Sequence, residues 1–179
     1  MPEVLLIRHA QALANKGDFV TFDNKESPLT DHGLAQCQTL HSTIKNDYGI
    51  DSSQYDGVVV ASEFVRPQQT AKATGFAKVD ISPLLNEPDF SRGLLTGPEI
   101  VAKHRNERWA PDEARVQARK LINVIVNGEF PYYFAFTHGM FTATVLLELE
   151  DVGHDMSDYI FDDKRGYVPL QTGIVQLKL

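Results

Sequence analysis

Three short apolar runs, each broken off at once by polar or charged residues, constrain the fold of this chain more than any other feature. They comprise residues 4–7, 57–61 and 132–136. Runs of this length that are rich in β-branched or aromatic residues are typical of strands buried on both faces of a parallel sheet. Stretches long enough for a helix separate them, so the sequence predicts strands that alternate with helices.

The helix expected after the first strand has the clearest boundaries. Thr30 can cap its first turn, Asp31 suits its positive end, and it should end between residues 46 and 49. Its expected apolar face consists of Leu34, Cys37, Leu40 and Ile44. Further helices are expected over residues 64–74, 99–105, 111–128 and 140–148, and further strands over residues 79–81 and 172–177. The fold class that follows is a three-layer α/β/α architecture with a mostly parallel central sheet, in which residues 1–179 form a single domain.

The charge balance argues against nucleic-acid and membrane-surface partners. The chain carries 17 Lys and Arg against 24 Asp and Glu, a formal net charge of -7, so an anionic ligand needs a local positive pocket. The apolar run near the start ends at Arg8, too early for a signal sequence or a membrane span. Cys37 is the only cysteine, which excludes an intrachain disulfide and suits the reducing cytoplasm.

The sequence contains no recognisable metal or cofactor motif, and we expect neither. It lacks a glycine-rich phosphate-binding loop that ends in lysine. Asp158, Asp162 and Asp163 lack the spacing of a calcium loop, so we interpret them as a solvated turn. The histidines away from the expected strand ends also lack ligand spacing and are expected at the surface or at helix caps: His32, His41, His104 and His154.

Polar side chains follow the three apolar runs closely. They are Arg8 and His9 after the first run, Ser62 and Arg66 after the second, and His138 after the third. Because the carboxyl ends of parallel strands meet along one edge of a sheet, one crevice can collect two guanidiniums and two imidazoles. Arginine binds two phosphate oxygens at once, and the helix start after Gly139 adds free backbone N–H groups. The pattern therefore predicts a pocket for a phosphate dianion.

A histidine in such a pocket points to covalent catalysis. A neutral imidazole can attack phosphorus, and His9 is the candidate for this step. A carboxylic acid must then protonate the departing oxygen, and Glu87, after the strand expected over residues 79–81, is the preferred candidate. Asp89 lies two residues further along the same proline-containing loop and stays an alternative.

Several segments occur in an order that is more specific than any one of them. They are residues 6–11 with Asn15, residues 27–30 with Gly33 and Gln36, Ser62 and Arg66 with residues 69–71, and residues 85–87, 137–139 and 172–174. Over nearly the whole chain, this series resembles the histidine phosphatase superfamily, also called the phosphoglycerate mutase-like family. Two positions depart from the family pattern: Ala10 stands where glycine is usual, and Pro67 where alanine is usual. Neither departure is expected to abolish activity.

The resemblance implies a role for each matched residue. It makes His9 the nucleophile and Glu87 the proton donor, with Arg8, Arg66 and His138 as the phosphate pocket. Substrate-binding groups also include Asn15 and Gly139.

The leading hypothesis is a metal-independent, cytoplasmic phosphatase that hydrolyses a phosphorylated small molecule through a phosphohistidine on His9. The stretch between Arg66 and His138 leaves room only for short helices over the site. A phosphoglycerate-type mutase is an alternative, although family members of that type generally have longer insertions. Two further alternatives are a phosphohistidine or phosphoprotein phosphatase and a non-catalytic module that binds phosphorylated ligands. The sequence leaves the substrate and the oligomeric state open.

Overall fold

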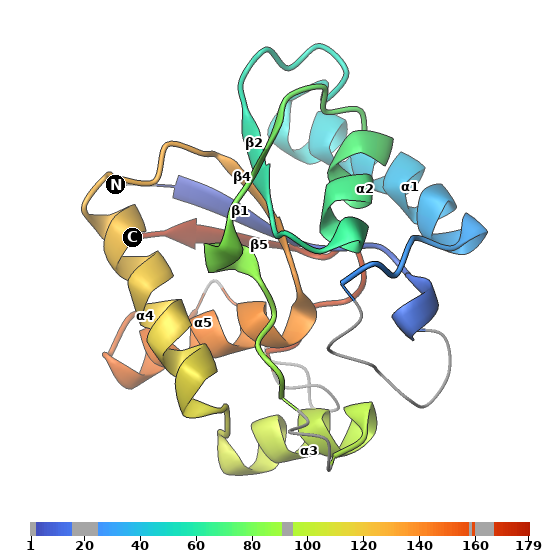
Figure 1. The fold of residues 1–179 in the computed structure, drawn as a ribbon. Helices are drawn as coiled ribbons and strands as arrows, with labels where there is room; N and C mark the ends of the chain where they lie inside the picture. The colour runs from blue at the N-terminus through green and yellow to red at the C-terminus, as the bar shows by residue number, and fades with distance from the viewer. Residues whose placement is uncertain (1–2, 16–24, 91–94, 158, 160–166) are drawn as a thin grey trace.

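The computed structural model describes residues 3–15, 25–90, 95–157, 159 and 167–179, with the backbone alone for Asn15. In this part of the chain, five strands form one sheet in the order β3-β2-β4-β1-β5 (Figure 1). The strands are β1 (Glu3–Arg8), β2 (Val59–Ala61), β3 (Val79–Ile81), β4 (Phe134–Thr137) and β5 (Ile174–Lys178). Neighbouring strands run parallel except β1 and β5, which are antiparallel.

Helices cover both faces of this sheet. The helices of the described residues are α1 (Asp31–Tyr48), α2 (Val65–Ala73), α3 (Gly97–Glu107), α4 (Asp112–Val126) and α5 (Gly139–Asp151), with short 3-10 turns η1 (Leu13–Asn15) and η2 (Pro83–Leu85). Figure 1 shows α1 and α2 on one side of the sheet and α4 and α5 on the other. Alternate residues of β1 enter the two cores: Leu5 packs in the α1 and α2 layer, and Leu6 in the α4 and α5 layer. The predicted three-layer α/β/α fold is confirmed.

Helix α1 has the predicted boundaries but a slightly different buried face. The Thr30 hydroxyl accepts a hydrogen bond from the Gly33 N–H at 3.0 Å, and Gly49 ends the helix in the left-handed conformation at φ 69°. Cys37 is buried among the core residues as expected. Leu34 is not, since 46% of it is exposed. The buried row begins instead at Gly33.

The expected strands extend too far at their amino ends. The second strand begins at Val59, because Val58 is 39% exposed and pairing with β3 starts one residue later. The third begins at Phe134 and runs on to Thr137. The last begins at Ile174, because Thr172 has a left-handed backbone, with φ 57°, that a strand cannot contain.

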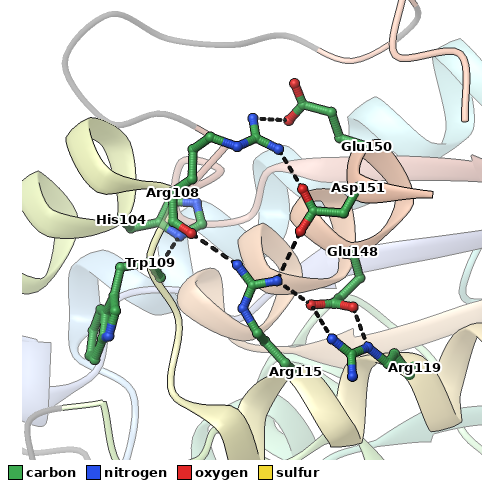
Figure 2. Close-up of polar contacts among 8 residues, drawn as sticks. All are labelled: His104, Arg108, Trp109, Arg115, Arg119, Glu148, Glu150 and Asp151. Atoms are coloured by element: carbon green, nitrogen blue, oxygen red, sulfur yellow. Dashed lines mark hydrogen bonds and ion pairs between the residues drawn. The ribbon is translucent and has the colours of Figure 1, made fainter. Parts of the chain in front are cut away.

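Helix α3 is set off below the sheet in Figure 1 and is joined to α5 by ion pairs. Arg108, which ends α3, contacts Glu150 and Asp151 at 2.7 Å each (Figure 2). Arg115 of α4 donates to the Arg108 carbonyl at 3.0 Å and to the buried carboxylate of Glu148 at 2.6 Å. These contacts tie the end of α3 to the packed pair formed by α4 and α5.

Some of the residues discussed above lie outside the described part of the chain, namely Asp158, Asp162 and Asp163. None of the helices in the described segments is both long and apolar enough to cross a bilayer. Within the same segments, no group of three or more His, Cys, Asp or Glu side chains is placed to hold a metal ion.

Candidate active site

The carboxyl ends of β1 and β4 and the first turn of α2 bring four predicted site residues together. His9 follows β1, Arg66 lies in the first turn of α2, and His138 precedes α5. All three are buried, and the rings of His9 and His138 meet edge to face with centroids 5.1 Å apart. Arg8, the last residue of β1, completes the group. The sequence prediction that distant strand ends meet in one place therefore matches the geometry.

His9 is held in one tautomer by its two hydrogen bonds. Its Nδ1 lies 2.7 Å from the carbonyl of Ala10, which can only accept, so Nδ1 carries the proton. Its Nε2 accepts from Nε of Arg66 at 3.1 Å and therefore presents a lone pair. Burial, followed by the charges of Arg66 and Arg8, holds the pKa of His9 well below its ordinary value. The ring is neutral, as a nucleophile must be.

Arg8 lies against the first turn of α5 because Gly139 has no side chain. A Cβ at Gly139 would stand 2.8 Å from Nε of Arg8 and 2.9 Å from its Cζ. The backbone of Arg8 bonds to Thr172 and Gly173, and Nη1 of Arg8 donates to the Pro169 carbonyl at 2.6 Å. The turn before β5 therefore fixes the first arginine at a helix amino end, where anions are favoured.

Arg66 is buried and linked to the residue after His9. The Ala10 N–H donates to the Thr70 hydroxyl at 3.0 Å, and this hydroxyl donates to the Arg66 carbonyl at 2.7 Å. The Arg66 guanidinium also lies over the ring of Phe64, with its Cζ 4.8 Å from the ring centroid. Thr70 thus couples the two chain segments that carry the nucleophile and the second arginine.

Glu87 reaches the same place from the loop after η2. Its Oε1 accepts the Met140 N–H at 2.9 Å, and its Oε2 lies 4.0 Å from Nη2 of Arg66 and 3.6 Å from Nδ1 of His138. Burial raises the pKa of Glu87, against the opposing effects of Arg66 and Arg8. A buried carboxyl with a raised pKa is suited to donate a proton.

The loop that carries Glu87 is held by side chains to which the sequence analysis gave no role. Nε2 of Gln117 donates to the carbonyls of Leu84 and Asn86 at 3.0 and 2.7 Å, and the Thr137 hydroxyl donates to the Leu85 carbonyl at 2.7 Å. Asn86, directly before Glu87, is held by Ser62 and Glu63. Its position next to Glu87 was the only sign in the sequence that it contributes to the site. Gln117 comes from a distant helix, and nothing in its local sequence distinguishes it.

The remaining predicted residues are placed as follows. Asp89 is half-buried in the same loop, whereas Glu87 lies within 4.0 Å of both Arg66 and His138. Asn15 ends η1, and its side chain lies outside the described part. His104 was expected at the surface but is buried, with Nδ1 3.0 Å from the Trp109 carbonyl, because α3 packs this face inward.

Comparisons with known proteins support the family resemblance and the fold. A family model described as the histidine phosphatase superfamily (branch 1) matches residues 4–160. A mycobacterial glucosyl-3-phosphoglycerate phosphatase, solved in complex with VO3, has a TM-score of 0.66 and 18% identity, covering 99% of this chain and 91% of that chain. A phosphoserine phosphatase variant from Entamoeba histolytica, in complex with phosphoserine, has a TM-score of 0.65 and 20% identity, covering 98% and 90%. No curated protein matches. At these identities, the structural similarity shows the fold alone.

Proposed function

The chain belongs to branch 1 of the histidine phosphatase superfamily, and from this premise we propose that it hydrolyses phosphomonoesters through a phosphohistidine on His9. The observation that carries the proposal is the state of His9. Its Nε2 accepts a hydrogen bond from Arg66 in a buried site that also feels the charge of Arg8, and its other nitrogen bonds to a backbone carbonyl. This combination provides an uncharged nucleophile where a phosphate dianion is attracted.

In the first step, the guanidiniums of Arg8 and Arg66 bind the phosphoryl oxygens beside the ring of His138, and Nε2 of His9 attacks phosphorus. The N–P bond forms as the ester P–O bond breaks, and Glu87 gives its proton to the departing alkoxide oxygen. In the second step, a water molecule attacks the phosphohistidine and transfers a proton to the Glu87 carboxylate. Inorganic phosphate leaves, and both side chains return to their starting states.

We propose that the reaction needs no metal ion. The two guanidiniums provide fixed positive charge for the equatorial oxygens, the role that divalent cations play in many phosphoryl-transfer sites. The prediction is that activity persists in EDTA.

The substrate proposed is a phosphorylated small molecule in the cytoplasm. Both structural relatives named above are phosphatases of such molecules. The buried, unpaired Cys37 also fits a reducing compartment. Which alcohol carries the phosphate is a question for substrate screening.

The test is to incubate the purified protein with a panel of phosphorylated metabolites in EDTA and to measure inorganic phosphate. Quenched reactions should contain a protein-bound phosphate that is labile in acid and stable in alkali, absent from His9→Ala. Transfer of phosphate between positions of a sugar acid would favour a mutase instead. Ligand binding with no turnover on any substrate would contradict the proposal and favour a binding module.

A further inference from the structure

His138 is connected to the protein surface through three polar side chains. Nε2 of His138 lies 3.0 Å from the hydroxyl of Ser62, and this hydroxyl lies 2.8 Å from Oδ1 of Asn86. Nδ2 of Asn86 donates to the carboxylate of Glu63 at 2.6 Å. The chain of contacts begins at an exposed acid and ends at a ring in the candidate active site.

The orientation of the Asn86 amide follows from its partners. The Glu63 carboxylate can only accept, so the amide nitrogen must face it. The Glu63 backbone N–H, at 2.9 Å from the other side of the amide, can only donate, so that side is the oxygen. Glu63 therefore determines the orientation of Asn86 twice, through its side chain and its backbone.

The orientation of Asn86 determines which group donates and which accepts in each of the other hydrogen bonds. Oδ1 of Asn86 has no proton to give, so the Ser62 hydroxyl must donate to it. Because the Ser62 hydroxyl has one proton and donates it to Asn86, its oxygen can only accept from its other two partners. These are the Phe64 N–H, at 3.2 Å, and His138. Nε2 of His138 must therefore carry a proton.

We propose that Asn86, acting through Ser62, is a positioning residue that fixes His138 as the tautomer protonated on Nε2, and so leaves Nδ1 as a lone pair directed at Glu87. Nδ1 has no hydrogen-bond partner among the described residues, and Oε2 of Glu87 is 3.6 Å away. The tautomer itself is independent of the proposed function, whereas its catalytic consequence rests on that function.

The consequence concerns where the proton of the general acid resides. Four groups face His138: His9, Arg8, Arg66 and Glu87. Burial, followed by His9, Arg66 and Arg8 in that order, holds the pKa of His138 well below its ordinary value. Because the His138 ring is neutral and its Nδ1 carries no proton, Oε2 of Glu87 faces a lone pair. This favours the protonated form of the Glu87 carboxyl. The opposite tautomer would place an N–H against Oε2 and favour the carboxylate. The arrangement thus keeps Glu87 ready to protonate a leaving group.

The test uses protein labelled with 15N in histidine, in which His138 is identified by the signal lost in His138→Gln. Long-range 15N–1H spectra at neutral pH distinguish the two tautomers. The wild type should show the proton on Nε2. In Asn86→Ala, the Ser62 hydroxyl is free to donate to Nε2, so the proton should move to Nδ1. Ser62→Ala removes the acceptor and should move it likewise, which keeps the test available should Asn86→Ala not fold.

A matched control exchanges the two surface partners. In the double variant Glu63→Gln with Asn86→Asp, the amide and the carboxylate trade places, and the Ser62 hydroxyl again finds an acceptor. This variant should retain the wild-type tautomer. A wild-type ring protonated on Nδ1, an unchanged tautomer in Asn86→Ala, or a reversed one in the double variant would each overturn the proposal.

Kinetics then test the consequence. For a substrate with a poor leaving group, Asn86→Ala should lose at least about tenfold in kcat/KM, since general acids contribute on the order of a hundredfold or more. The basic limb of its pH profile should move to lower pH, because the Glu87 carboxylate is now favoured, whereas the double variant should recover the wild-type profile. The expected tautomers in a protein without turnover would overturn the proposed function alone, because the spectra do not depend on catalysis. Reversed tautomers with an unmoved pH profile would overturn the consequence for Glu87.

Discussion

Nε of Arg66 donates to Nε2 of His9 at 3.1 Å, so the arginine that would bind the phosphoryl group also occupies the lone pair that would attack it. An incoming phosphate dianion offers Arg66 a stronger, charged acceptor than a neutral imidazole. Binding of the substrate would therefore release the nucleophile. Without a phosphate present, the same bond keeps His9 neutral and oriented.

This relationship predicts how His9 titrates. Removing the Arg66 charge in Arg66→Met takes away the second-largest cause of the lowered His9 pKa, so that pKa should rise. Because only neutral His9 attacks, the acid limb of the kcat/KM profile should move to higher pH, and kcat/KM should fall about a hundredfold or more. Histidine 15N titration measures the pKa directly. Arg119→Met, which changes an arginine that is 58% exposed, is the control that should leave His9 unshifted.

Loss of the nucleophile should abolish turnover without unfolding the protein. His9→Ala removes a side chain just beyond the carboxyl end of β1 and should lower kcat by about four to six orders of magnitude. Turnover and circular dichroism measured together separate chemistry from folding. His32→Ala, on the exposed side of α1, should behave as wild type. A fully active His9→Ala protein is incompatible with the mechanism.

Glu87 and Asp89 can be distinguished by leaving-group dependence. In Glu87→Gln, the rate on alkyl phosphates should fall about a hundredfold or more, and far less on aryl phosphates whose leaving groups need no proton. Asp89→Asn should affect both substrate types equally and weakly. A selective loss in Asp89→Asn instead would transfer the role of general acid to Asp89.

The sequence predicts which polar residues gather at the strand ends better than it predicts the boundaries of the elements that carry them. Arg8, His9, Arg66 and His138 are placed by strand ends, which follow from apolar runs. Leu34 was assigned to the buried face of α1 because periodicity cannot show that Gly33 packs closely on the Gln11 carbonyl, where a Cβ would come within 2.1 Å.

Burial and hydrogen bonding that depend on long-range packing could not be predicted. His104 lies on the buried face of α3, and its Nδ1 lies 3.0 Å from the Trp109 carbonyl, a contact that depends on how the chain runs from α3 to α4. Asn86 acts on His138 only through Ser62, which comes from a separate segment. Local pattern carries no information about such pairings.

The ion pairs between α4 and α5 should contribute unequally to stability (Figure 2). Glu148 has a side chain only 3% exposed, and Arg115, at 21%, contacts both it and Asp151. Arg115→Ala should cost about 2 kcal/mol, a fall of about 4 to 8 °C in Tm, because a buried carboxylate loses a partner. Arg119→Ala should cost less than about 1 kcal/mol, since that guanidinium is mostly solvated. Equal costs in calorimetry would contradict this ranking.

Gly139 is predicted to be needed for phosphate binding and not for the stability of the fold. Its backbone accepts alanine, but the added methyl group would stand 2.8 Å from Nε of Arg8, which must move away. Gly139→Ala should therefore keep or slightly raise Tm, since alanine favours helices, while kcat/KM falls about tenfold to a hundredfold. The inhibition constant of inorganic phosphate should rise in parallel.

Gly33 offers the matched contrast, because a methyl group there meets the backbone carbonyl of Gln11 at 2.1 Å instead of a movable side chain. Gly33→Ala should lower Tm by several degrees, as overpacking against a backbone atom costs on the order of 1 to 3 kcal/mol. Melting curves and inhibition by inorganic phosphate, measured on Gly33→Ala and Gly139→Ala, show whether each variant loses stability or phosphate affinity. Normal phosphate affinity in Gly139→Ala would mean that Arg8 does not need its place at the start of α5.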